Sequence, residues 1–142
     1  MKRIFAFVII AVMLFSLVSC SEKASVSPDQ LNNNQNLSKG GYTNLKQEEA
    51  KINLDADKSI ILLDVRTPEE YADVHIPGSI LIPLDTLQNA AEKKLTDKDA
   101  TIYVYCRSGN RSASASKILA DLGYKNIYNI GGIATWPYET EK

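Results

Sequence analysis

Residues 106–112, Cys-Arg-Ser-Gly-Asn-Arg-Ser, place one thiol among two guanidinium groups and a glycine. The stretch follows a continuous apolar run and precedes a segment with helical periodicity, so we expect a loop between a buried strand and a helix. Backbone N–H groups of such a loop can face the sulfur, and the N-terminus of the helix adds partial positive charge. These features stabilise a thiolate, so the sequence predicts a lowered pKa and a nucleophilic sulfur at Cys106. The expected anion-binding loop around this sulfur comprises Arg107, Ser108, Gly109, Asn110 and Arg111.

Apolar runs and helical segments alternate along the chain on either side of this loop. The continuous apolar runs at 60–65 and 102–106 are typical of strands covered on both faces, as in a parallel sheet. The alternation predicts an α/β fold with a mainly parallel sheet, in which ligands bind at the carboxyl ends of the strands. Shorter strands are expected at 42–45, 80–82 and 127–130, and helices at 47–54, from 67 onward, at 86–95 and at 111–122.

The composition bounds the class of protein. The 142 residues are enough for one domain of ordinary size, and the net charge of −1 argues against a nucleic-acid partner. Two cysteines are too few for a fold stapled by several disulfides. With a single histidine there is no cluster from which to build a metal site, so we expect no metal ion.

Residues 1–19 have the pattern of an export signal. Lys2 and Arg3 precede an uncharged apolar run at 4–18, shorter than the roughly 20 residues that a membrane-spanning helix needs. The run ends in Leu-Val-Ser before Cys20, a sequence that resembles the lipobox of bacterial lipoproteins. The resemblance implies cleavage before Cys20, a lipid on that residue, and an exported protein anchored to a bacterial membrane, at the periplasmic face or the cell surface. The alternatives are an ordinary signal peptide or an uncleaved anchor.

The remainder of the chain divides into three parts. Residues 20–41 hold the cysteine expected to be lipidated and a stretch rich in Ser, Asn and Gln, which we interpret as a flexible tether; the alternative is an arm packed on the domain. Residues 42–138 are long enough for one hydrophobic core and form the expected domain. Residues 139–142 are a C-terminal tail, and a monomer is expected.

Five sequence patches, in a fixed order, resemble the rhodanese-like sulfurtransferase domain. They are Asp-Val-Arg at 64–66 with the acidic stretch that follows, His-Ile-Pro-Gly-Ser at 75–79, Ile-Pro at 82–83, the loop at 106–111, and Gly-Gly at 131–132 followed by Trp136. The resemblance covers essentially all of 42–138. It implies a rhodanese-like three-layer fold, with a sheet of about five mainly parallel strands and helices on both faces.

The resemblance also implies a reaction. The Cys106 thiolate would take the outer sulfur of a donor such as thiosulfate and become a persulfide. The persulfide would then pass this sulfur to a thiophilic acceptor, either cyanide or a thiol. No metal or organic cofactor is required. The expected partners are therefore a small sulfur-containing anion, the acceptor, and a membrane reached through the lipid on Cys20, with no nucleic acid.

Other functions remain open from the sequence. Cys106 to Arg111 is a C-x4-R loop, whereas tyrosine phosphatases use C-x5-R, a wider loop for phosphate; a phosphatase or arsenate reductase is thus the less favoured enzyme. A binding or sensing module could hold a persulfide or an anion on Cys106 without turnover. A redox role lacks a second cysteine to resolve a disulfide within the domain. The non-functional alternative is that Cys106 is buried and unreactive and that the neighbouring arginines lie on a solvent-exposed turn.

Asp64 and Arg66 are expected to support the loop. Arg66 and Glu70 are four residues apart at a helix start, which favours a salt bridge between them, and Asp64 is expected to hydrogen-bond a loop. The alternative for Arg66 is contact with the substrate. His75 and Trp136 are interpreted as packing residues rather than catalytic ones.

Overall fold

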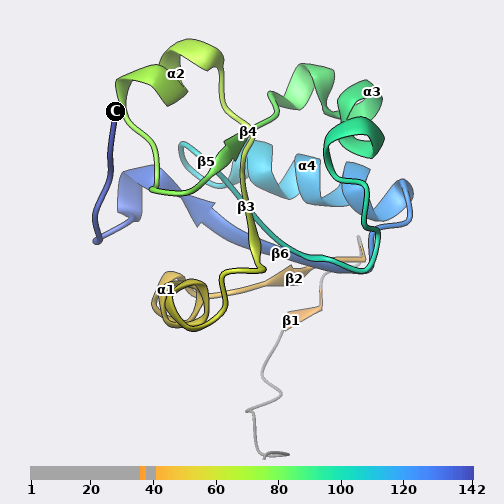
Figure 1. Cartoon of the computed structure of the whole chain (residues 1–142), viewed down its shortest axis with the longest axis horizontal. Coiled ribbons are helices and arrows are strands. Elements are labelled where there is room, and N and C mark those ends of the chain that lie inside the picture. Colours follow the sequence, from red (N-terminus) through yellow and green to blue (C-terminus); the bar gives the residue numbers. More distant parts are fainter. Residues whose placement is uncertain (1–35, 38–40) are drawn as a thin grey trace, which may run out of the picture. The chain divides into compact units, whose positions relative to one another are not determined.

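One sheet organises the part of the chain that the computed structural model describes, residues 36–37 and 41–142 (Figure 1). Its strands lie in the order β1-β2-β6-β5-β3-β4. The five strands from β2 to β4 in this order run parallel, and β1 pairs antiparallel with β2. The strands are β1 Asn36–Leu37, β2 Thr43–Asn44, β3 Ile61–Asp64, β4 Ile80–Leu81, β5 Thr101–Cys106 and β6 Asn126–Gly132.

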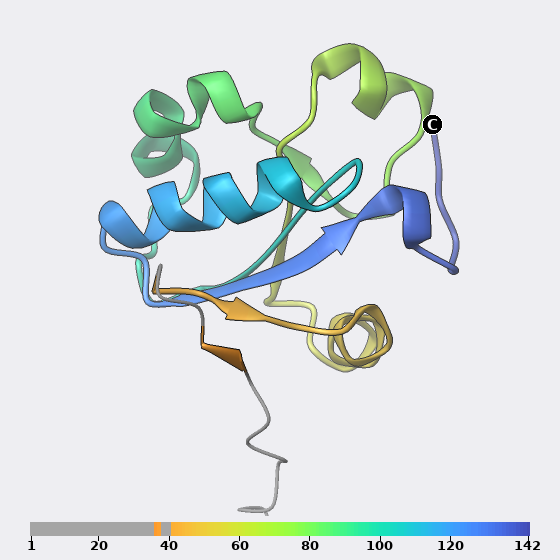
Figure 2. The same ribbon diagram turned by 180° about the vertical axis from the view of Figure 1, so that it is seen from behind.

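Helices cover both faces of this sheet, as the two views in Figures 1 and 2 show. Helix α1 lies on one face, and α3 and α4 lie on the other, while α2 follows the carboxyl end of β3. The expected five-stranded parallel sheet between two helical layers is confirmed. The helices are α1 Gln47–Ala56, α2 Pro68–Asp73, α3 Leu84–Lys94 and α4 Asn110–Asp121, with a 3-10 turn at Ile133–Thr135.

Strand β5 shows how the core is divided between the two faces. Ile102, Val104 and Cys106 pack into the cluster that includes the buried residues of α3 and α4. Tyr103 and Tyr105 alternate with them and pack into the cluster on the α1 side. Successive side chains of a strand point to opposite faces, so the register of β5 puts the sulfur on the side of α3 and α4.

Local sequence signals determine where the helices beside the site begin and end. Thr67 and Glu70 form a capping box at the start of α2, each side chain bonded to the other residue's backbone N–H, and Pro68 occupies the first turn. Helix α4 ends at Asp121, and the chain reverses at Gly123, whose φ of +90° permits the turn. The N–H groups of Gly123 and Tyr124 bond back to the carbonyls of Ala120 and Leu119, which is the Schellman arrangement.

Hydrogen-bonded structure extends beyond residues 42–138 in both directions. Strand β1 falls within residues 20–41, the segment interpreted as a tether, so the sheet begins before residue 42. The tail at 139–142 is bonded to the fold, because Glu141 and His75 exchange backbone hydrogen bonds of 2.8 Å in both directions. The expected signal peptide and Cys20 lie outside the described residues. Within the described ranges, no helix has the length and apolar character needed to span a membrane.

Candidate active site

Cys106 is the last residue of β5, between β3 and β6 in the sheet order, and it is buried. The backbone N–H of Gly109 donates to the sulfur at 3.1 Å. Burial of the thiol acts to raise the pKa of Cys106. The backbone N–H groups of Ser112 and Gly109, the Ser112 hydroxyl and the Ser108 N–H outweigh it, so the pKa lies below the usual value. This direction agrees with the expectation from the sequence.

The backbone of the loop turns at Gly109, which immediately precedes α4. Its φ of +103° lies in the left-handed region, which a glycine adopts without a steric penalty. No side chain of the described residues caps this end of the helix, so backbone N–H groups at the start of α4 are left to face the sulfur. Ser108 and Asn110 have exposed side chains. Within residues 108–110, backbone groups rather than side chains thus face the sulfur.

The two arginines of the loop differ in what they contact. Arg111 forms a two-pronged ion pair with Glu70 at 2.7 and 2.8 Å, which lowers the pKa of Glu70 to about 2. The Arg107 side chain is exposed, whereas its backbone carbonyl accepts a hydrogen bond of 3.1 Å from the Ala134 N–H. The sequence suggested two free positive charges beside the sulfur, but the charge of Arg111 is offset by a carboxylate.

The expected salt bridge between Arg66 and Glu70 is wrong. Arg66 instead bonds Asp64, with an Nη2–Oδ2 distance of 2.6 Å between side chains that are 2% and 0% exposed. Arg66 precedes Thr67, the capping residue of α2, so the four-residue spacing of a helix does not apply to it. Asp64 does bond a loop as expected, since it accepts the Arg66 backbone N–H at 2.9 Å. Arg66 also donates to the Val74 carbonyl and so ties both ends of α2 to β3.

Two functional candidates escaped the sequence analysis, Ser112 and Asn129. Ser112 is fully buried, and its Oγ lies 3.7 Å from the sulfur and 2.6 Å from Asn129 Oδ1. A signal for Ser112 was present, because it shares the inner face of α4 with Ala115 and Leu119 and is polar there. No comparable signal marks Asn129, which is one of two asparagines in β6.

The glycines at the end of β6 let this strand pass close beneath the loop. A Cβ atom at Gly132 would overlap the backbone of Arg107 and Ser108. The Gln47 side chain of α1 donates to the Gly132 carbonyl at 2.9 Å and to the Ile130 carbonyl at 3.2 Å. Of the Gly-Gly pair noted in the sequence, Gly132 is therefore the residue whose lack of a side chain lets β6 approach the loop.

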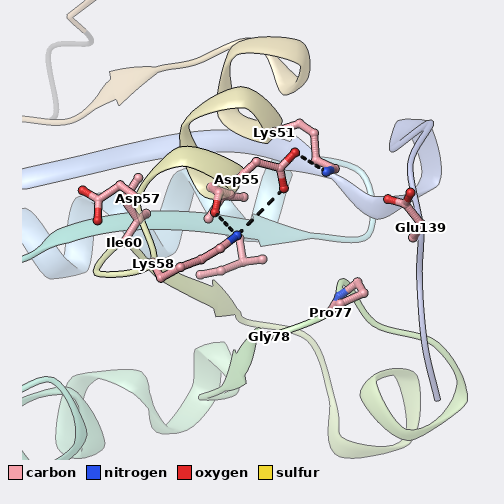
Figure 3. Close-up of a pocket in the computed structure, with 10 residues that line it drawn as sticks. Lys51, Asp55, Asp57, Lys58, Ile60, Pro77, Gly78 and Glu139 are labelled. Atoms are coloured by element: carbon pink, nitrogen blue, oxygen red, sulfur yellow. Dashed lines mark hydrogen bonds and ion pairs between the residues drawn. The ribbon is translucent and has the colours of Figure 1, made fainter.

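One hollow on the surface of the described residues lies beside the loop. A cavity of about 530 Å³ is lined by residues that follow β3 and β4 and by Arg111, with apolar walls that include Val65 and Leu84. A second cavity of about 560 Å³ lies between α1 and the turn at Pro77, and no loop residue lines it (Figure 3). There Asp55 sits between Lys51 and Lys58, so the charges of this second cavity largely satisfy one another.

Comparison with known proteins agrees with the geometry of the site. The family model for the rhodanese-like domain matches residues 46–138. Thiosulfate sulfurtransferase PspE of Escherichia coli is 39% identical over 71 residues, which are 50% of this chain and 68% of that protein. Thiosulfate sulfurtransferase GlpE of Coxiella burnetii is 35% identical over 80 residues, 56% of this chain and 73% of that one.

A solved structure described as a rhodanese with anions from E. coli is 35% identical to this chain. It superposes with a TM-score of 0.55 over 58% of this chain and 98% of that one. The fold of the matched part of this chain is thus shared with a rhodanese of known structure. The chain belongs to the rhodanese-like domain family and is a sulfurtransferase of that family.

Proposed function

We propose that the chain moves the outer sulfur of a small anion such as thiosulfate to a thiophilic acceptor through a persulfide on Cys106. The observation that carries this proposal is the set of backbone N–H groups around the Cys106 sulfur, which lowers its pKa in a buried site. Those groups can stabilise negative charge both on the thiolate and on the sulfur that it acquires.

In the first step, the thiolate of Cys106 attacks the outer sulfur of thiosulfate. A new S–S bond forms, the S–S bond of the donor breaks, and sulfite leaves with the electron pair. In the second step, cyanide or a thiolate attacks the terminal sulfur, and the Cys106 thiolate leaves. The relatives named thiosulfate sulfurtransferase, and the structural neighbour described with anions, support an anionic donor for this chain.

The cavity beside Arg111 provides room for the acceptor. Its volume of about 530 Å³ exceeds what cyanide needs, and its walls are apolar, so a thiol with a carbon skeleton fits its chemistry better.

The test is a mass measurement on the full-length chain carrying Cys20→Ser, in which Cys106 is the one thiol. After incubation with thiosulfate, we expect a gain of about 32 Da, the mass of one sulfur, that is lost on adding cyanide or dithiothreitol. The matched control adds Cys106→Ser and should gain nothing. Hydrolysis of an aryl phosphate or reduction of arsenate without sulfur uptake would contradict the proposal. A chain that shows none of these activities would point to the binding module.

We also propose that the chain is exported and anchored by a lipid on Cys20. Lys2, Arg3, the uncharged run at 4–18 and the Leu-Val-Ser that precedes Cys20 support this. Expression in a bacterium followed by membrane fractionation tests it. The natural chain should sediment with membranes and take up labelled fatty acid, whereas Cys20→Ser should take up none. Equal labelling of both chains, or no labelling of either, would contradict the lipid anchor.

A further inference from the structure

The Ser112 hydroxyl has one proton to donate but lies within hydrogen-bond distance of three acceptor oxygens. Its Oγ lies 2.6 Å from Asn129 Oδ1, 2.9 Å from the Gly109 carbonyl and 3.1 Å from the Gly131 carbonyl, all of them acceptors. Its fourth neighbour is the Cys106 sulfur at 3.7 Å. A hydroxyl donates once and accepts twice, so its lone pairs can receive the thiol proton while its own proton goes to an acceptor.

Asn129 is the nearest of these acceptors, and its amide orientation follows from its other bonds. Its Nδ2 donates to Asn44 Oδ1 at 3.0 Å, and its Oδ1 accepts the Gly131 N–H at 3.1 Å. Oδ1 therefore keeps a partner when the Ser112 proton turns away. The Gly109 carbonyl likewise accepts the Ala113 N–H at 3.1 Å. Rotation of the hydroxyl thus leaves neither of these two acceptors unsatisfied.

We propose that Ser112 is a further catalytic residue, whose hydroxyl changes partner as Cys106 ionises. In the thiol form, S–H donates to Ser112 Oγ, and the Ser112 proton bonds Asn129 Oδ1. When the thiol proton leaves to solvent, the hydroxyl turns its proton to the thiolate and releases Asn129. When the persulfide forms, negative charge moves to the terminal sulfur, and the Ser112 proton returns to Asn129.

The ionic side chains near Cys106 keep their charges when the Ser112 hydroxyl changes partner. The ionic groups nearest the Cys106 loop are Arg107 and Arg111 of the loop, Glu70 of α2 bonded to Arg111, and the pair formed by Asp64 of β3 and Arg66 just after it. The other charged residues of α2 and α4 are exposed and lie outside the loop: Glu69, Asp73, Lys117 and Asp121. The described residues of β6 place the neutral Asn129 beside Ser112. Because all these ionic groups remain in a Ser112 variant, a changed titration of Cys106 would report on the hydroxyl.

Helix α4 offers a matched control at Ser116, one turn beyond Ser112. Ser116 is also fully buried, and its hydroxyl has no hydrogen-bond partner among the residues that the structure describes. Ser116→Ala therefore removes a buried oxygen from the same helix without touching the exchange described above. Asn129→Leu supplies the opposite perturbation, because a side chain of similar size removes the nearest of the three competing acceptors and excludes water from its place.

The experiment measures the rate of iodoacetamide alkylation of Cys106 against pH in the full chain, resolved from Cys20 by peptide mass spectrometry. Ser112→Ala should slow alkylation near pH 7 by about tenfold, the worth of one hydrogen bond to a charged group, and reach the unmodified plateau at high pH. Asn129→Leu should speed alkylation near pH 6, because the Ser112 proton becomes free for the thiolate. Ser116→Ala should leave the profile unchanged.

A merely structural role would move both variants the same way, since each would loosen the loop. Profiles of Ser112→Ala and Asn129→Leu displaced in the same direction would therefore overturn the proposal, as would a Ser112→Ala profile identical to that of Ser116→Ala. Melting curves identify a variant that does not fold. If one of the two variants fails to fold, the direction in which the other shifts the alkylation profile decides the outcome. No sulfur donor is present, so failure of the thiosulfate experiment and failure of this one are separate results.

Discussion

Two arginine–carboxylate pairs flank the Cys106 loop, and they differ in depth. Asp64 and Arg66 are 0% and 2% exposed, whereas Glu70 and Arg111 are 27% and 33% exposed. The first pair connects β3 to the segment before α2, and the second connects α2 to the start of α4. The buried pair thus belongs to the scaffold, while the outer pair controls a charge beside the sulfur. Similar chemical groups serve different purposes because their contact with water differs.

The largest effect should come from breaking the buried pair. Arg66→Ala leaves the Asp64 carboxylate buried without its partner and frees the Val74 carbonyl. We expect the free energy of unfolding to fall by about 3–5 kcal/mol, measured by urea denaturation. The matched control is Asp64→Leu combined with Arg66→Met, which removes both charges and should recover much of the loss. A double variant as unstable as the single one would show that the charges themselves stabilise the fold.

A smaller effect is expected at the outer pair and should depend on pH. The Arg111 guanidinium lowers the pKa of Glu70 to about 2, below its value of 4.5 without a partner. A lowered folded-state pKa gives stability that is fully present above about pH 4.5 and is lost as the pH falls toward 2. Glu70→Gln should therefore cost about 1–2 kcal/mol at pH 7 after allowance for screening by solvent. Paired denaturation curves of the two chains should converge as the pH approaches 2.

Convergence is the informative part of this measurement. Both chains carry the same other carboxylates, so general acid denaturation cancels in the difference between them. A gap that stays constant from pH 7 to pH 2 would mean that the charge of the Glu70 carboxylate, and with it the ion pair with Arg111, is not what the variant loses.

The contrast between the two pairs also shows what the sequence could predict. The alternation of apolar and helical segments was sufficient for the α/β layers, because a strand covered on both faces has a continuous apolar pattern. The loop was recognisable because its residues are contiguous. Which carboxylate pairs with which arginine was not predictable. Glu70 is 41 residues from Arg111 in the sequence, and only the packing of α2 against α4 brings the two side chains together.

The same limit explains why Ser112 and Asn129 were missed. Ser112 stands beside the loop in the sequence, but its function depends on a contact with Asn129, which is 17 residues away on another strand. The β5–β6 register shift between Val104 and Tyr105 lies nearby, and no sequence rule marks it. A prediction from one sequence gives the elements and the contiguous motif, whereas side-chain networks between elements require coordinates.

The smallest effect on stability is expected at Arg107, and it sharpens the contrast with Arg111. The Arg107 side chain is exposed, and its backbone carbonyl makes the contact with Ala134 that holds the loop. Arg107→Ala should therefore change the free energy of unfolding by less than about 0.5 kcal/mol. Its positive charge can still attract an anionic donor, so the rate of persulfide formation from thiosulfate should fall modestly at low salt and match the unmodified chain at high salt. A deficit that persists at high salt would instead place the Arg107 side chain in direct contact with the donor.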